Sequence, residues 1–90
     1  MILCVIKDRI SGLPETTPIA FPNGDTAIKA FADFCKGEKV VHPEEFELIK
    51  IATYDDESIQ LTDTTRCSLS FGNSVNEQLE QILIKLRGEE

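Results

Sequence analysis

The sequence predicts an α+β fold, in which a small antiparallel or mixed sheet of about four strands carries two amphipathic helices on one face. Three features predict it: a β-branched, apolar opening run, two segments with apolar residues at helical spacing, and short alternating stretches between them. The expected element order is β-α-β-β-β-α. With 90 residues, 41% of them hydrophobic, the chain suffices for a single domain with one core and leaves little room for a deep pocket.

The first strand is expected over residues 2–7, where ILCVIK has the composition of a strand buried on both faces. Glycine and proline then predict a loop to about residue 16. Residues 17–21 extend briefly before the turn signal Pro22-Asn23-Gly24.

The first helix is expected to begin after Asp25, a plausible N-cap, and to end near Gly37. Its apolar residues recur at i, i+3, i+4, i+7 and i+8 and so form one stripe, consisting of Ala27, Ala30, Phe31, Phe34 and Cys35. This stripe predicts a helix packed against the sheet.

The middle of the chain reads as a helical turn followed by three strands. Pro43 fits the first position of a single helical turn, and residues 46–54 form the next strand. Residues 55–58 have turn composition and lead into a short strand over 58–62. The last strand, over residues 66–71, alternates strictly and is expected to point Cys67, Leu69 and Phe71 into the core and Arg66, Ser68 and Ser70 outward.

The second helix is expected to start with a capping box, Ser74-Val75-Asn76-Glu77, and to run to about Arg87. It carries a second apolar stripe, formed by Val75, Leu79, Ile82, Leu83 and Leu86. The stripe is used either within the monomer or in a homodimer through this C-terminal helix, and the sequence leaves both open.

Charge and cysteine usage bound the class of protein. The formal net charge of −7 predicts a soluble chain that phosphate repels unless its few cations cluster. Lys7 interrupts the N-terminal apolar run too early for a signal peptide, and no run approaches the ~18 apolar residues of a membrane span. The three cysteines, Cys4, Cys35 and Cys67, lack C-x-x-C spacing, so we expect reduced, buried thiols in an intracellular protein.

No catalytic, metal or cofactor site is predicted. Three adjacent acids, residues 55–57, point to alternating sides if extended and lack the spacing of a calcium loop, so a solvated turn is the simpler reading. His42 has no second histidine, and the chain contains no GxSxG, Walker or GxGxxG motif. We therefore expect a non-enzymatic protein that acts through its exterior.

Two surface roles remain. The candidate nucleic-acid residues are the cations that flank the predicted elements: Lys7, Arg9, Lys29, Lys36 and Lys39. The five phenylalanines are expected in the core, which leaves Tyr54 as the one aromatic for base stacking. The acidic segment fits a protein partner with a basic surface, through Glu44, Glu45, Tyr54, Asp55, Asp56 and Glu57.

Two segments, AFPNGDTAIKAF and HPEEFELIKIATYDDE, resemble the small non-structural protein of microviruses, in particular the gokushovirus group. That family has a phenylalanine and an asparagine before a helix that opens Ala-Ile-Arg/Lys-x-Phe, matched here by Phe21, Asn23 and residues 27–31. Its second motif, Pro-(Glu/Asp)-(Asp/Glu)-(Phe/Tyr)-x-Leu with a closing (Tyr/Phe)-Asp-(Asp/Glu), is matched by residues 43–48 and 54–56. The resemblance covers residues 1–57. The family's Thr-Gly after the acidic turn is replaced by Ser58-Ile59, and residues 58–90 add a strand and the C-terminal helix.

The resemblance implies a non-enzymatic viral protein in the cytoplasm of the host bacterium. It implies a role in switching replication from duplex DNA to single-stranded synthesis and packaging, with viral or host replication proteins or single-stranded DNA as partners. By matched position, Lys29 is expected to touch phosphate, and Asp55 and Asp56 are expected to meet a protein. The alternative reading is a phage-encoded inhibitor that blocks a host defence or nucleic-acid enzyme by protein contact.

Overall fold

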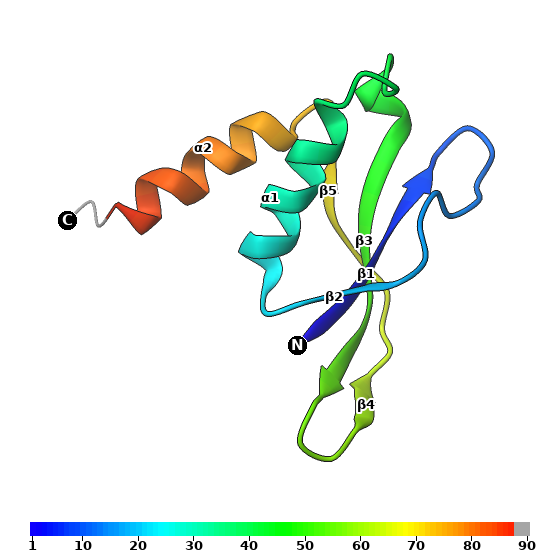
Figure 1. The fold of residues 1–90 in the computed structure, drawn as a ribbon, viewed down its shortest axis with the longest axis vertical. Coiled ribbons are helices and arrows are strands. Elements are labelled where there is room, and N and C mark those ends of the chain that lie inside the picture. Colours follow the sequence, from blue (N-terminus) through cyan, green and yellow to red (C-terminus); the bar gives the residue numbers. More distant parts are fainter. Residues whose placement is uncertain (88–90) are drawn as a thin grey trace.

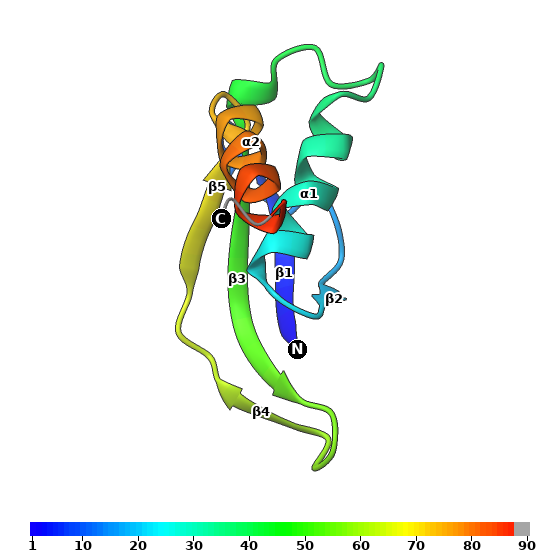
Figure 2. The same cartoon turned by 90° about the vertical axis from the view of Figure 1, so that its left-hand side faces the viewer.

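The computed structural model describes residues 1–87 and confirms the α+β fold. The elements in chain order are β1 (Ile2–Asp8), β2 (Ile19–Phe21), α1 (Gly24–Cys35), the single 3₁₀ turn η1 (Pro43–Glu45), β3 (Phe46–Asp55), β4 (Gln60–Asp63), β5 (Cys67–Phe71) and α2 (Val75–Leu86). The sheet has five strands, all paired antiparallel, because the brief extension before α1 forms β2. Both helices lie on one side of the sheet, to the left of the strands in Figure 1 and in front of them in Figure 2.

The central strand of the sheet is β3. It pairs along one side with β1 and along the other with β4 and then β5, while β2 pairs with the outer side of β1. The hairpin formed by β3 and β4 extends beyond the rest of the molecule, at the bottom of both views (Figures 1 and 2). No helix within residues 1–87 is long and apolar enough to cross a membrane.

The alternation expected in β5 is wrong in part. The pairing with β3 runs from Leu48–Ser70 to Ile49–Ser68, so Leu69 is an extra residue in β5. Such a bulge reverses the alternation beyond it. Ser70 therefore lies on the helix side, 3% exposed, and Phe71 lies on the opposite face, 38% exposed. Cys67 is exposed as well, because β5 is an edge strand.

The core lies between α1 and the sheet. Phe31 and Ala27 of α1 are completely buried and pack with Cys4, Ile6 and Leu48 from β1 and β3. The helix begins one residue after Asn23, whose side-chain oxygen accepts a hydrogen bond from the Thr26 N–H at 2.9 Å. The expectation that Asp25 is the N-cap is wrong, because the extended residue before the helix is Asn23.

The helix α2 is held differently. Ser74 occupies the N-cap position, but its hydroxyl donates to the Phe71 carbonyl at 3.4 Å and makes no capping bond, so the capping box is wrong. Gln78 instead ties the helix to β5: its amide donates to the Leu69 carbonyl at 3.0 Å, and the Ser70 hydroxyl donates to its side-chain oxygen. Of the α2 residues, Val75 alone is fully buried. The helix then leaves the sheet, as Figure 1 shows.

Candidate nucleic-acid and partner interfaces

The face of the sheet opposite the helices carries a basic surface. Side chains alternate along β1, and Cys4 and Ile6 belong to the core on the helix side, so Val5 and Lys7 point to the other face. A hollow of about 300 Å³ lies there and is lined by Val5, Lys7, Gly12, Pro14, Ile49 and Arg66. Two cations therefore border an apolar floor on the face of the sheet that carries no helix.

Arg9 and Phe71 extend this surface toward the end of β1. The guanidinium carbon of Arg9 lies 4.9 Å from the centre of the Phe71 ring, which is a cation–π contact. Two hydrogen bonds hold Arg9 in this position: its backbone N–H donates to the Glu45 carbonyl at 2.7 Å, and its side-chain guanidinium donates to the Glu44 carbonyl at 3.2 Å. Lys7 and Phe71 both pair with Glu47, on either side of β3, so all three share the face. We call Lys7, Arg9, Arg66 and Phe71 the basic sheet face; one acid, Glu47, lies on the same face between Lys7 and Phe71.

The structure brings together two of the five cations expected to bind nucleic acid. Lys7 and Arg9 lie on the basic sheet face. Lys29 lies on α1, beside a hollow between the two helices, while Lys36 caps the C-terminal end of α1 and Lys39 follows in the next loop. The helices and this face lie on opposite sides of the sheet. Arg66 and Phe71 are not among the binding residues expected from the sequence. The outward position of Arg66 in its alternating segment could have indicated a surface role for it, whereas Phe71 is expected in the core.

The acids expected to meet a protein are divided between the two ends of β3. Glu44 and Glu45 lie in η1, before the strand, and Asp55, Asp56 and Glu57 follow at its other end. At about 3.3 Å per residue, a strand of 10 residues separates the two groups by roughly 30 Å. The two groups therefore form separate surfaces.

The group beyond β3 forms a projecting acidic hairpin, residues 54–61. Hydrogen bonds from the Ser58 hydroxyl, and from the N–H groups of Glu57 and Ser58, hold the pKa of the Asp55 carboxyl below its ordinary value. Ile59 follows with a left-handed φ of 57°, which a β-branched residue rarely adopts, and is 74% exposed. Leu61, opposite Tyr54, is 53% exposed. The hairpin thus presents charged acids beside two uncovered apolar side chains.

Comparison with known proteins identifies the family. The profile of the Phage ORF5 protein family matches residues 1–79. The chain belongs to the Phage ORF5 protein family. It is a phage protein, and the family description assigns no function. No curated protein and no solved structure matches it.

The thiols of this phage protein differ in their surroundings. Cys4 and Cys35 are buried; burial raises the pKa of Cys4 to about 11, with the Lys50 ammonium acting weakly against it, and also raises the pKa of Cys35. The expectation of three buried thiols is wrong for Cys67, which is exposed. The Nδ1 atom of His42 lies 3.4 Å from a Glu44 carboxylate oxygen on the surface. Over residues 1–87 no three His, Cys, Asp or Glu side chains converge in a way that could hold a metal ion.

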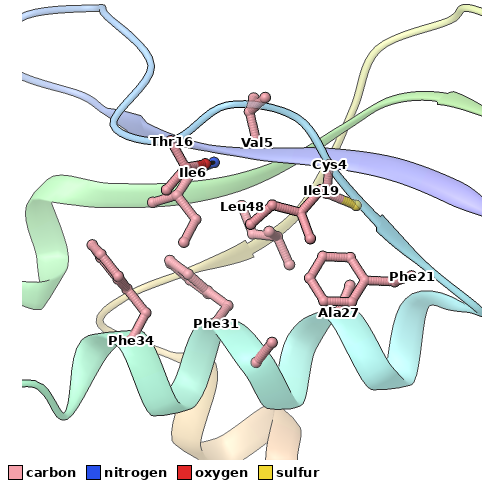
Figure 3. A pocket seen from close by; sticks show the side chains of 11 residues that line it. Cys4, Val5, Ile6, Thr16, Ile19, Phe21, Ala27, Phe31, Phe34 and Leu48 are labelled. Atoms are coloured by element: carbon pink, nitrogen blue, oxygen red, sulfur yellow. Dashed lines mark hydrogen bonds between the residues drawn. The ribbon is translucent and has the colours of Figure 1, made fainter.

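A pocket of about 180 Å³ lies between α1 and the strands β1 and β2, although the sequence predicted little room for one. Figure 3 shows the residues that line it, among which Val5 turns its side chain away to the other face of the sheet: Cys4, Val5, Ile6, Thr16, Ile19, Phe21, Ala27, Ala30, Phe31, Phe34 and Leu48. None of these side chains is charged, and the Thr16 hydroxyl oxygen already accepts a hydrogen bond from the Ile6 N–H at 3.3 Å. The lining of the pocket is therefore almost entirely apolar.

Proposed function

We propose that this phage protein is a microvirus-type non-structural protein that binds single-stranded DNA through the basic sheet face. It acts in the host cytoplasm, without catalysis, during the switch from duplex replication to single-stranded synthesis and packaging. The observation that carries the proposal is the arrangement of Arg9 over the Phe71 ring, with Lys7 and Arg66 on the same face.

This arrangement supplies the two contacts that a single strand requires. Lysine and arginine neutralise successive phosphates, and an exposed aromatic ring or guanidinium plane stacks on a base of any sequence. A strand could therefore follow the sheet face while one base lies against Arg9 or Phe71. The net charge of −7 works against tight binding, so we expect weak association that a replication protein can reverse.

Titration of a fluorescent oligothymidine at low salt tests the proposal. Three phosphate contacts predict that log K falls with log salt with a slope of about −2. The double variant Lys7→Glu/Arg66→Glu should weaken binding at least ~10-fold, and Phe71→Ala should cost ~1–3 kcal/mol of binding free energy through lost stacking.

Lys29→Glu is the control on the helix side of the molecule, where it makes half the charge change of the double variant. It also tests the phosphate contact that the resemblance implies for Lys29. A loss equal to that of the double variant would place the DNA over α1 instead of the basic sheet face. No binding by the parent protein at low salt would refute direct DNA contact.

The acidic hairpin favours a second candidate, an inhibitor or replication factor that docks on a basic protein surface. Its carboxylates match a groove that normally holds nucleic acid, and Ile59 and Leu61 supply apolar contact area. Asp55→Lys/Asp56→Lys should abolish capture of one host protein from nuclease-treated lysate, while Glu44→Lys/Glu45→Lys, at the other end of β3, should not. Capture that survives the hairpin variant would refute this contact.

A further inference from the structure

The pocket between α1 and the strands β1 and β2 arises from small side chains. On α1, the helix face that is turned toward the sheet presents Ala27 and Ala30 beside two phenylalanines. Across from the helix, β1 contributes Cys4, another small residue (Figure 3). Two alanines and a cysteine therefore leave a space of about 180 Å³ that the surrounding larger side chains do not fill.

Bulky apolar side chains enclose this space. Phe31 and Phe34 come from α1, and Leu48 comes from β3 on the sheet side (Figure 3). Ile19 and Phe21 alternate along β2, and the pairing of β2 with β1 places both on the helix side of the sheet. The lining therefore combines three aromatic rings with branched aliphatic chains.

The pocket meets the solvent on the side of β2. Ile19 is 41% exposed although it lines the pocket, and Phe21 and Ala30 are half-buried. The strand β2 has only three residues and lies at the edge of the sheet, so few backbone hydrogen bonds hold it in place. A small molecule therefore has a route into the pocket between β2 and α1.

The few polar groups of the pocket select against charged ligands. Burial raises the pKa of the Cys4 thiol to about 11, so the thiol is neutral at physiological pH. The Thr16 hydroxyl oxygen is already bonded to the Ile6 N–H, and no lysine, arginine or acid lines the space. A charged ligand would lose its hydration without gaining an ionic partner.

We propose that this pocket binds a small uncharged molecule that carries one aromatic ring or a short branched alkyl chain. A cavity of about 150 Å³ lined by leucine, isoleucine and phenylalanine stays dry and binds benzene, and this pocket has a similar size and lining. Voids larger than a water molecule are few in protein interiors, because the side chains around them lose packing contacts. A guest that restores those contacts stabilises the folded chain.

NMR of the methyl groups during a benzene titration, without DNA, tests the proposal separately from any DNA function. Benzene protons should give nuclear Overhauser effects to the methyl groups of Ile6, Ile19 and Leu48, which line the pocket. Benzoate is the matched control ligand, because it adds to the same ring a carboxylate that the lining cannot pair, and it should leave these methyl groups unchanged. Equal shifts with benzoate, or benzene contacts confined to exposed α2 residues such as Leu83 and Leu86, would overturn the site.

Thermal unfolding measures the stabilisation that the guest provides. At ten times the dissociation constant obtained from the titration, benzene should raise Tm by roughly 5–11 °C for a domain of this size. An unchanged Tm at saturating benzene would overturn the proposal.

Filling the pocket tests its location. Ala30→Leu should weaken benzene binding at least ~10-fold, because the added carbons occupy the space that the guest requires. Leucine is a good helix former and Ala30 is half-buried, so circular dichroism should show unchanged helical content. Ala20→Leu is the matched control, since it adds the same atoms at an exposed position of β2 that does not line the pocket. Undiminished binding by Ala30→Leu, or an equal loss in Ala20→Leu, would overturn this pocket as the site.

Discussion

The two helices have the same length and the same kind of sequence, but they are used differently. Each has 12 residues and one apolar stripe, yet α1 buries Ala27, Phe31, Ala32 and Cys35 while α2 buries only Val75. The difference arises because α1 lies along the sheet, whereas α2 touches it through its first turns and then leaves it (Figure 1). A stripe therefore shows which side of a helix seeks an apolar neighbour and does not show that the neighbour belongs to the same chain.

The largest contrast is expected from truncating one side chain of each stripe. Phe31→Ala should reduce the free energy of unfolding by ~3–5 kcal/mol, because it removes a completely buried ring. Leu86→Ala should change it by less than ~0.5 kcal/mol, because that side chain is 69% exposed. Urea unfolding of dilute protein measures both. Equal losses would mean that α2 packs on its own chain as α1 does.

Thiol labelling should sharpen the contrast between the closed core under α1 and the open edge at β5. At pH 8, iodoacetamide should modify Cys67 first. Cys4 should react at least ~100-fold more slowly than an ordinary thiol of pKa 9.0, because its own pKa of about 11 lowers the fraction of thiolate. The rate at Cys4 should rise with each pH unit toward 11. Mass spectrometry of quenched samples reads each site, and equal rates at Cys4 and Cys67 would show that the core is open.

The smallest contrast concerns the N-terminal ends of the helices. Asn23→Ala should cost ~1 kcal/mol of stability, since it removes the oxygen that caps α1. Ser74→Ala should cost less than ~0.5 kcal/mol, because the Ser74 hydroxyl makes no capping bond. Thermal unfolding by circular dichroism compares the two. A larger loss for Ser74→Ala would reinstate the capping box expected from the sequence.

The parts of the fold that depend on neighbouring residues could be predicted. Apolar spacing indicated α1 and α2, Pro43 indicated the turn before β3, and the acids after Tyr54 indicated the hairpin. The outward direction of Phe71 could not be predicted, because it depends on the bulge at Leu69, and that bulge is defined only by the pairing of β5 with β3.

The candidate sites were likewise predictable only where they depend on residues that are close in the sequence. Lys7 and Arg9 are close in sequence and stay together, whereas Arg66 joins Lys7 only through the sheet. The acids of residues 44–57 read as one segment, but the strand between them carries the two groups to opposite ends. Composition therefore identified the charged residues, and topology decided which of them share a surface.

The pairing of β1 with β3 also bears on how the chain reaches its native state. These strands lie on either side of α1 in the sequence. The centre of the sheet, where β1 pairs with β3, therefore cannot form until the long segment between the two strands has closed into a loop. The helix inside that loop can form early from local contacts alone. We therefore expect the folding rate to be governed by the encounter of β1 with β3, so that substitutions in these strands slow refolding more than substitutions in the outer turns of α2.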